Sequence, residues 1–212
     1  MNLVILTKSS KHGKYCVAGI DVSNGNWVRL TTDDANTDGA VSDEDLECID
    51  GRNAQVMDEI EIDVEPDPDP IQPENMKLIP RNGLPRFIQQ CDLNMVLQIH
   101  SAERENYVFF TRYKTIKPEY INNPKSLMLI EVRNLVVEEK NNKAVASFDY
   151  AANRYTDIYV TDPEMYPIID SGDVIESLNA FLVVSLGKPY ISRVTDERLC
   201  YKFVAKIFVL GE

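Results

Sequence analysis

Residues 1–30 read MNLVILTKSSKHGKYCVAGIDVSNGNWVRL, and this segment gives the clearest indication of the fold. The short, apolar, β-branched run Leu3–Leu6 predicts a first strand, and Tyr15–Val22 and Trp27–Leu30 predict two more. The Asn-Gly pair between the last two strands is typical of a hairpin turn. The polar segment Lys8–Lys14, which contains three lysines, is expected to be the loop between the first two strands.

The pattern of this hairpin predicts which side chains point away from the core. A two-residue turn at Asn24-Gly25 would place Arg29 opposite Ile20 and mix polar with apolar side chains, because a one-residue shift moves every side chain to the other face. We therefore expect a three-residue or bulged loop, with Gly25 or an asparagine at positive φ. Ile20 would then join Val28 and Leu30 in the core. The outward face is expected to consist of Tyr15, Val17, Trp27 and Arg29.

Length and composition favour a soluble β protein. The chain has 212 residues, enough for one large β domain or two small ones, and 44% of them are hydrophobic. No run approaches the roughly 20 apolar residues of a membrane helix, and the N-terminus lacks the pattern of a signal peptide. The four cysteines are scattered without a CxxC motif, so we expect reduced thiols in a cytoplasmic protein: Cys16, Cys48, Cys91 and Cys200.

The net charge of −12 is concentrated in one block. Residues 1–31 carry four basic side chains against one acid, residues 32–75 carry sixteen acids against Arg52 alone, and the remainder is balanced. An acidic protein is usually a poor ligand for nucleic acid, because attraction to phosphates dominates that affinity. The field at the basic hairpin could still be positive, and the acidic block could fold over the hairpin and compete with an anionic ligand.

The rest of the chain alternates short strands with polar loops. Before a boundary near residues 101–106 we expect strands at 56–64, 76–79 and 95–99 and a helix at 84–91, and after it strands at 107–113, 126–137, 144–150, 156–161, 180–186 and 200–210. Prolines at 66, 68, 70 and 73 exclude regular structure between the first two of these strands. Many short strands with few helices favour barrels or sandwiches.

Several short motifs together resemble the prokaryotic dual OB-containing domain family. They are Thr7-Lys8-Ser9, Lys11, Gly13, Tyr15–Ile20, Trp27–Leu30, Gln72-Pro73-Glu74-Asn75, Tyr159–Pro163, Val184–Leu186, Leu199–Lys202 and Val204-Ala205, and the likeness covers nearly the whole chain. The resemblance implies an all-β fold with minor α content, made of two OB-like barrels packed together. The first would comprise residues 1–100, with a long acidic and proline-rich loop at 32–75, and the second residues 101–212. It also implies a ligand- or nucleic-acid-binding role in prokaryotic conflict systems, and no catalytic residues.

OB-folds bind ligands on the face of strands 2 and 3 and with the loop between strands 1 and 2. In single-strand binders, aromatic rings on that face stack on bases and lysines follow the phosphates. The expected ligand-binding set is therefore Lys8, Lys11, His12, Lys14, Tyr15, Trp27 and Arg29. The alternative is that Trp27 packs under the second barrel and the lysines are only solvated.

A weaker pattern points to a metal. Asp34-Ala35-Asn36-Thr37-Asp38-Gly39 is similar to the start of a calcium loop, with Asp45 at the twelfth position, so the candidate ligands are Asp34, Asn36, Asp38 and Asp45. Against this, glutamate is usual at position twelve, and a strand rather than a helix precedes the loop. A polar loop followed by a capped short helix is the alternative.

The sequence thus predicts a non-enzymatic binding module that recognises single-stranded nucleic acid or a nucleotide through the strand 2–3 face of the first barrel. The alternative is a protein–protein adaptor whose contact surface is the acidic segment 32–75. No cofactor and no membrane partner are expected. No phosphate-binding glycine loop is present, and a hydrolase or nuclease that uses the carboxylate block and a divalent metal has no fixed motif.

Overall fold

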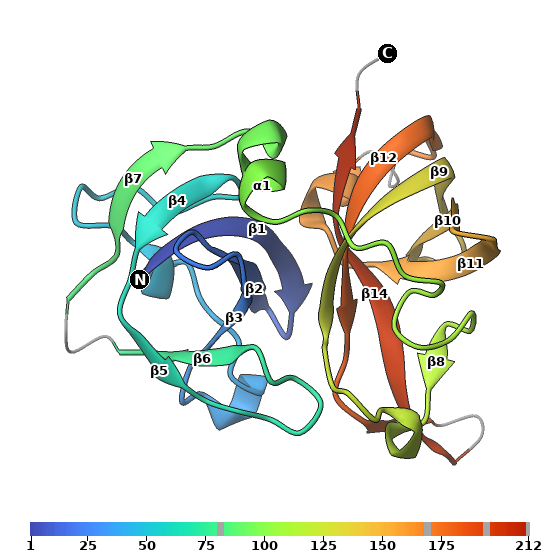
Figure 1. Cartoon of the computed structure of the whole chain (residues 1–212), viewed down its shortest axis with the longest axis horizontal. Coiled ribbons are helices and arrows are strands. Elements are labelled where there is room, and N and C mark those ends of the chain that lie inside the picture. Colours follow the sequence, from blue (N-terminus) through green and yellow to red (C-terminus); the bar gives the residue numbers. More distant parts are fainter. Residues whose placement is uncertain (80–82, 168–170, 193–195, 211–212) are drawn as a thin grey trace. The chain divides into compact units, whose positions relative to one another are not determined.

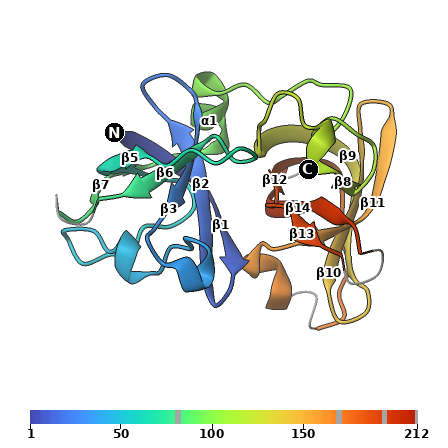
Figure 2. The same ribbon diagram turned by 90° about the horizontal axis from the view of Figure 1, so that it is seen from below.

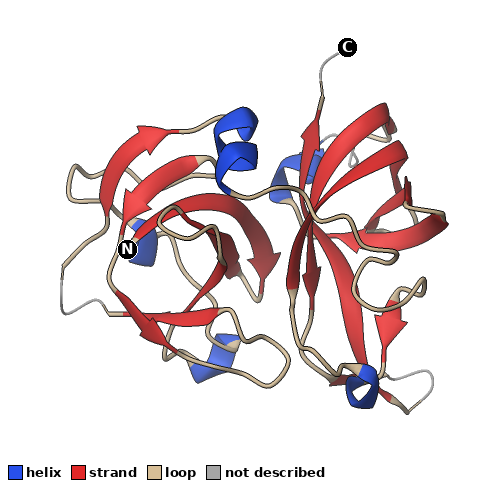
Figure 3. Ribbon diagram, in the orientation of Figure 1, coloured by secondary structure: helices blue, strands red, loops and turns tan. Residues whose placement is uncertain are grey.

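The computed structural model describes residues 1–79, 83–167, 171–192 and 196–210 (Figure 1). Strands make up most of the regular structure, and the helices are short (Figure 3). The chain divides into two compact units. Unit 1 comprises Met1–Asp69 and Glu74–Ser101, and unit 2 comprises Pro70–Pro73 and Ala102–Glu212. Within the described ranges, no helix has the length and apolar character needed to span a membrane.

Unit 1 is a half-barrel whose seven strands follow the order β5-β6-β3-β2-β1-β4-β7. Its first three strands form an antiparallel meander, and Figure 2 shows them side by side. The third strand runs parallel to β6. The strand bounds are β1 (Asn2–Lys11), β2 (Lys14–Asp21), β3 (Trp27–Thr31), β4 (Asp58–Glu61), β5 (Val64–Pro66), β6 (Asn75–Leu78) and β7 (Arg86–Gln90).

Unit 2 contains a closed five-stranded barrel. Its strands follow the order β11-β10-β9-β12-β14, and parallel pairing of β11 with β14 closes the ring. Two short strands pair with β14 outside this ring. The bounds are β8 (Thr115–Ile116), β9 (Leu127–Glu139), β10 (Ala144–Tyr150), β11 (Asn153–Val160), β12 (Ile175–Leu186), β13 (Tyr190–Ile191) and β14 (Arg198–Val209).

The two units share one connectivity. Each contains a three-stranded meander, β1-β2-β3 in unit 1 and β9-β10-β11 in unit 2, whose third strand runs parallel to a later strand, β6 and β14 respectively. In unit 2, β12 lies between β14 and β9. In unit 1 the equivalent segment is split, so that β4 pairs with β1 and β5 pairs with β6. The predicted fold class, mostly β with two OB-like units, is therefore confirmed.

Each unit has its own apolar core. The core of unit 1 includes Leu3, Ile5, Val17, Val28, Leu30, Val41, Leu46, Ile60 and Ile62. The core of unit 2 includes Met128, Ile130, Val132, Phe148, Tyr155, Ile158, Val160, Leu182, Val184 and Val204. All four cysteines are free thiols, and three of them are buried. Burial raises the pKa of Cys48 and of Cys91.

The helices are short. The α-helix is α1 (Leu93–Ile99), and the 3-10 helices are η1 (Ala35–Thr37), η2 (Glu44–Leu46), η4 (Pro118–Tyr120) and η5 (Pro163–Met165). The side chain of Asp162 accepts a hydrogen bond from the Glu164 amide and caps η5. In the turn between β9 and β10, Asn141 has φ 54° and Asn142 has φ 58°.

Three predicted elements were wrong. The segment expected to be a helix, 84–91, contains strand β7, and the segment expected to be a strand, 95–99, lies in α1. The helix begins where the Asp92 side chain accepts a hydrogen bond from the Met95 amide. The prediction relied on the short apolar pattern and did not use this capping residue. The predicted strand 107–113 is irregular, because Phe109 and Phe110 have φ values of 40° and 57°, outside the β region.

A lysine lies in the core of the closed barrel. Lys202 shares the inward face of β14 with Cys200 and Val204, and its side chain does not extend to the solvent. Its Nζ donates to the carbonyl oxygen of Thr111 at 2.6 Å and lies 5.3 Å from the centroid of the Tyr155 ring. Burial of the ammonium lowers the pKa of Lys202 to about 7.

This lysine predicts a pH-dependent stability. The unfolded chain keeps the proton up to the ordinary lysine pKa of 10.5, whereas the folded protein releases it above about 7. Between those values the unfolded state binds more protons, so the free energy of unfolding rises with pH. We expect urea midpoints to increase from about pH 7 to about pH 9, and Lys202→Met to remove most of that increase. Exposed Lys143→Met is the control, and an unchanged pH slope in Lys202→Met would refute the assignment.

Candidate nucleic-acid interface

The lysines of the first hairpin lie on strands, not in a loop. β1 extends to Lys11 and β2 begins at Lys14, so the connection is the two-residue turn His12-Gly13. Both turn residues have positive φ, 50° for His12 and 77° for Gly13. The predicted loop Lys8–Lys14 was therefore wrong in its conformation. Because strands hold their side chains more firmly than a loop does, the lysines have defined positions.

Each of the three hairpin lysines is paired with a carboxylate of the acidic segment. Nζ–O distances are 3.2 Å for Lys8–Asp43, 3.0 Å for Lys11–Asp38 and 2.9 Å for Lys14–Asp34. Lys11 also donates to the backbone carbonyl of Asp38 at 2.7 Å. The acidic segment reaches the hairpin because Tyr15 and Val41 exchange two backbone hydrogen bonds of 2.9 Å. The basic hairpin is thus neutralised by its own chain.

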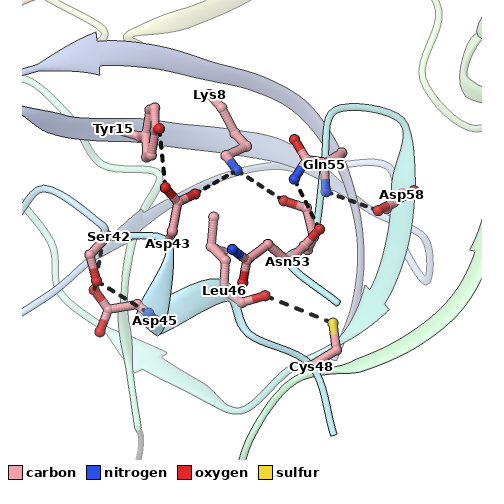
Figure 4. Close-up of polar contacts among 11 residues, drawn as sticks. Lys8, Tyr15, Ser42, Asp43, Asp45, Leu46, Cys48, Asn53, Gln55 and Asp58 are labelled. Atoms are coloured by element: carbon pink, nitrogen blue, oxygen red, sulfur yellow. Dashed lines mark hydrogen bonds and ion pairs between the residues drawn. The ribbon is translucent and has the colours of Figure 1, made fainter. Parts of the chain in front are cut away.

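Lys8 is buried and belongs to a polar network that extends to the surface (Figure 4). Its Nζ donates to Asp43 and, at 3.1 Å, to the carbonyl oxygen of Ala54, and only 8% of the residue is exposed. The hydroxyl of Tyr15 donates to the other carboxylate oxygen of Asp43 at 3.2 Å, and the Lys8 ammonium lies 4.9 Å from the centroid of the Tyr15 ring. The charge of Asp43, and then burial, raises the pKa of Tyr15. Lys8 therefore supports the loop beside it.

Three of the four candidate calcium ligands have other partners for their side chains. Asp34 caps η1, accepts from Thr37 Oγ1 and pairs with Lys14, and the hydrogen bond from Lys14 lowers the pKa of Asp34 to about 2. Asp38 pairs with Lys11, and the carboxylate of Asp45 accepts from the amide and hydroxyl of Ser42. The backbone amide of Asn36 donates to Asp34. In the described ranges, no three His, Cys, Asp or Glu side chains gather as a metal site.

The second turn is longer than the three-residue loop that the sequence predicted, and its length changes the faces. Ile20 pairs with Trp27 and Ala18 with Arg29, residues 22–26 join β2 to β3, and Gly25 has φ 71°. Because an even number of residues separates Ile20 from Trp27, Ile20 shares a face with Trp27 and Arg29, and Val17 lies with Val28 and Leu30 in the core. The predicted assignment of Ile20 and Val17 was therefore wrong.

The outward placement of Arg29 was also wrong. Arg29 is 4% exposed, and its Nη1 donates to the Cys16 sulfur at 2.7 Å. Trp27 is half-buried, and its ring lies edge-on to that of His100 with centroids 5.3 Å apart. His100 directly follows α1, and its Nδ1 lies 2.8 Å from the Gly25 carbonyl oxygen. Sequence reasoning missed this histidine because it expected a strand at 95–99.

The predicted ligand-binding residues therefore separate into two groups. Those on the β1–β2 turn remain accessible, since His12 is exposed and Lys11, Lys14 and Tyr15 are half-buried. Those with structural contacts are Lys8, Trp27 and Arg29. Sequence reasoning did not identify which acids of the segment 32–75 pair with which lysines, because those contacts span 20 to 35 residues.

The repeated five-stranded connectivity, with a basic turn between the first two strands, defines a protein of the OB class that carries the fold twice. A family model described as the dual OB-containing domain matches residues 1–207, and the chain belongs to this family. Neither the curated proteins nor the solved structures contain a match to the chain. OB folds commonly bind nucleic acids and oligosaccharides.

The burial of Arg29 predicts a structural effect of its removal. Arg29→Ala deletes a buried side chain and its contact with Cys16, so we expect the free energy of unfolding to fall by about 2 kcal/mol or more. Lys11→Ala, which deletes a half-exposed ion pair, should cost less than about 1 kcal/mol. Urea unfolding followed by circular dichroism measures both. Equal stability of Arg29→Ala and the unmodified protein would contradict the structural role.

Proposed function

We propose that this chain is a non-enzymatic binding module that recognises single-stranded nucleic acid or a nucleotide through the β1–β2 turn of unit 1. The observation that supports this most strongly is that the hairpin lysines each hold a carboxylate at 2.9 to 3.2 Å. An ammonium placed to hold a carboxylate oxygen can hold a phosphate oxygen in the same way. Membership of an OB family supports the same ligand class.

The two outer ion pairs are suited to exchange. Side-chain exposure is 26% and 47% in the pair Lys11–Asp38, and 33% and 27% in Lys14–Asp34. Half-exposed pairs of this kind contribute only about 0–1 kcal/mol, so a phosphate can replace the carboxylate at little cost. Lys8 is nearly buried and also holds the Ala54 carbonyl, so it keeps its partner.

The proposal assigns a role to each accessible residue. Lys11 and Lys14 would bind phosphates, the exposed His12 would contact the ligand from the turn, and the ring of Tyr15 would stack on a base. Because only two lysines bind phosphates, and because the adjacent segment is acidic, the affinity should be modest. Its logarithm should fall with the logarithm of salt concentration with a slope of about −1 to −2.

Opposite charge changes within one ion pair test this function. Lys11→Glu should weaken binding of a fluorescent single-stranded oligonucleotide, and Asp38→Asn should strengthen it by about threefold or more, because it removes the internal competitor. Fluorescence anisotropy across a salt series measures both. The matched control is Asp50→Asn, which removes the same charge from the acidic segment, but whose partner is Arg52 at 3.0 Å. An equal gain in Asp38→Asn and Asp50→Asn would show only a general charge effect and contradict the exchange.

A second function has one observation in its favour. Ile49 and Leu84 are 69% and 53% exposed, and the Ile49 amide donates to the carbonyl of Pro85, beside acidic residues. An exposed apolar and acidic surface fits a protein partner with basic and apolar side chains. Absence of oligonucleotide binding at low salt, even in Asp38→Asn, would favour this adaptor role. Metal-dependent cleavage of the oligonucleotide would instead favour a nuclease.

A further inference from the structure

Unit 2 contains a pocket of about 680 Å³ beside the turn between β9 and β10. Its lining combines aromatic rings with polar side chains, among them Tyr159, Tyr166, Phe203, Glu139, Asn142 and Lys143. The volume lies within the range of roughly 300–1,000 Å³ that is usual for small-molecule sites. Neither the family resemblance nor the charge pattern of the sequence indicated this site.

Two of the rings form a continuous aromatic surface. Tyr159 on β11 and Phe203 on β14 are direct neighbours in the parallel ladder. Both point out of the barrel, because the adjacent residues Val160 and Val204 belong to the core. A Cβ at Gly187 would come within 3.0 Å of the Phe203 ring, so the glycine leaves room for that ring. Half-buried rings on neighbouring strands can stack on a planar ligand.

The turn beside this surface matches the basic turn of unit 1. In both units a two-residue turn flanked by lysines joins the first two strands of the meander. Lys11 and Lys14 flank His12-Gly13 between β1 and β2, and Lys140 and Lys143 flank Asn141-Asn142 between β9 and β10. In unit 2, Lys140 pairs with Glu138 at 2.8 Å and with Asp157 at 2.9 Å.

Lys143 differs from the other three turn lysines. No carboxylate of the described residues lies within ion-pair distance of it, and its ammonium is 4.7 Å from the centroid of the Tyr159 ring. The side chain is exposed, and among residues 1–79, 83–167, 171–192 and 196–210 its charge has no acidic partner at the edge of the pocket. This position is available to an anionic group of a ligand whose planar part lies on the rings.

We propose that this pocket binds a nucleotide unit, with the base against Tyr159 and Phe203 and the phosphate on Lys143. The amide of Asn142 and the carboxylate of Glu139 supply a donor and acceptors for the edge of the base. A cationic ligand fits less well, because the Lys143 ammonium, 4.7 Å from the centroid of the Tyr159 ring, would repel it. The ligand class is that of the proposed function, but the site is in the other unit and does not require the unit 1 turn.

Two variants of lining residues, Tyr159→Leu and Lys143→Ala, and one matched control test the proposal. Calorimetry with adenosine 5′-monophosphate should give an affinity that falls by about tenfold or more in Tyr159→Leu, which keeps apolar volume and removes the ring. It should fall by about threefold or more in Lys143→Ala. Lys140→Ala removes the same charge from the same turn, outside the pocket lining, and should change the affinity by less than about twofold. Circular dichroism confirms that each variant folds, and exposed Lys143→Ala decides the matter if Tyr159→Leu does not fold.

A second arm distinguishes the source of the nucleotide. A labelled adenosine single strand of roughly ten nucleotides that binds more tightly than the mononucleotide, with the same two losses, identifies a nucleotide within a strand. Equal or weaker binding of the strand identifies a free nucleotide, and both results support the pocket. The pocket proposal is overturned if Tyr159→Leu and Lys143→Ala bind both ligands as tightly as the unmodified protein does. It is also overturned if the protein binds tetramethylammonium in preference to both. Lys11→Glu changes the unit 1 turn alone. A loss of affinity in Lys11→Glu that is absent from Tyr159→Leu and Lys143→Ala therefore belongs to unit 1, and failure of either proposal is recognised separately.

Discussion

The antiparallel β-bridge between Tyr15 and Val41 is the contact that forms the unit 1 site. It attaches the acidic segment to β2 directly beside the basic turn, where Asp34, Asp38 and Asp43 meet the three lysines. Lysines at the ends of two adjacent strands would otherwise repel one another, and the carboxylates remove that repulsion. The asymmetry of charge along the sequence therefore becomes a local balance in the structure.

The two units carry one topology with different consequences at the same turn. In unit 1 both turn lysines are paired, so an anionic ligand must displace Asp34 or Asp38. In unit 2 one turn lysine is paired and Lys143 lies over an aromatic ring instead. The duplicated fold thus provides two basic turns, one internally neutralised and one open. A single net charge for the whole chain does not describe either of them.

The sequence predicted strands well where the alternation of apolar and polar residues continued over many positions. It predicted them less well where a contact distant in sequence determined the local structure. Alternation identified β2, β3 and most strands of unit 2, whereas 84–91 and 95–99 were exchanged because short apolar runs fit a helix or a strand equally. The cap at Asp92 was the available local signal. The faces of the second hairpin depended on whether the loop had an odd or even length, which the Asn-Gly pair alone does not determine. Partners such as Asp38 and Lys11, 27 residues apart, follow only from the fold.

An acidic protein can still bind an anion if the acidic side chains near the binding site are paired with basic ones. The three aspartates that face the hairpin neutralise it at rest, and each one displaced becomes a solvated carboxylate near the ligand. Binding at unit 1 therefore includes the loss of an ion pair, which binding at Lys143 does not require. If the direct contacts at the two sites were equally favourable, a ligand would bind the pocket of unit 2 at lower concentration than the turn of unit 1. The turn of unit 1 would bind only a ligand that supplies more than one phosphate.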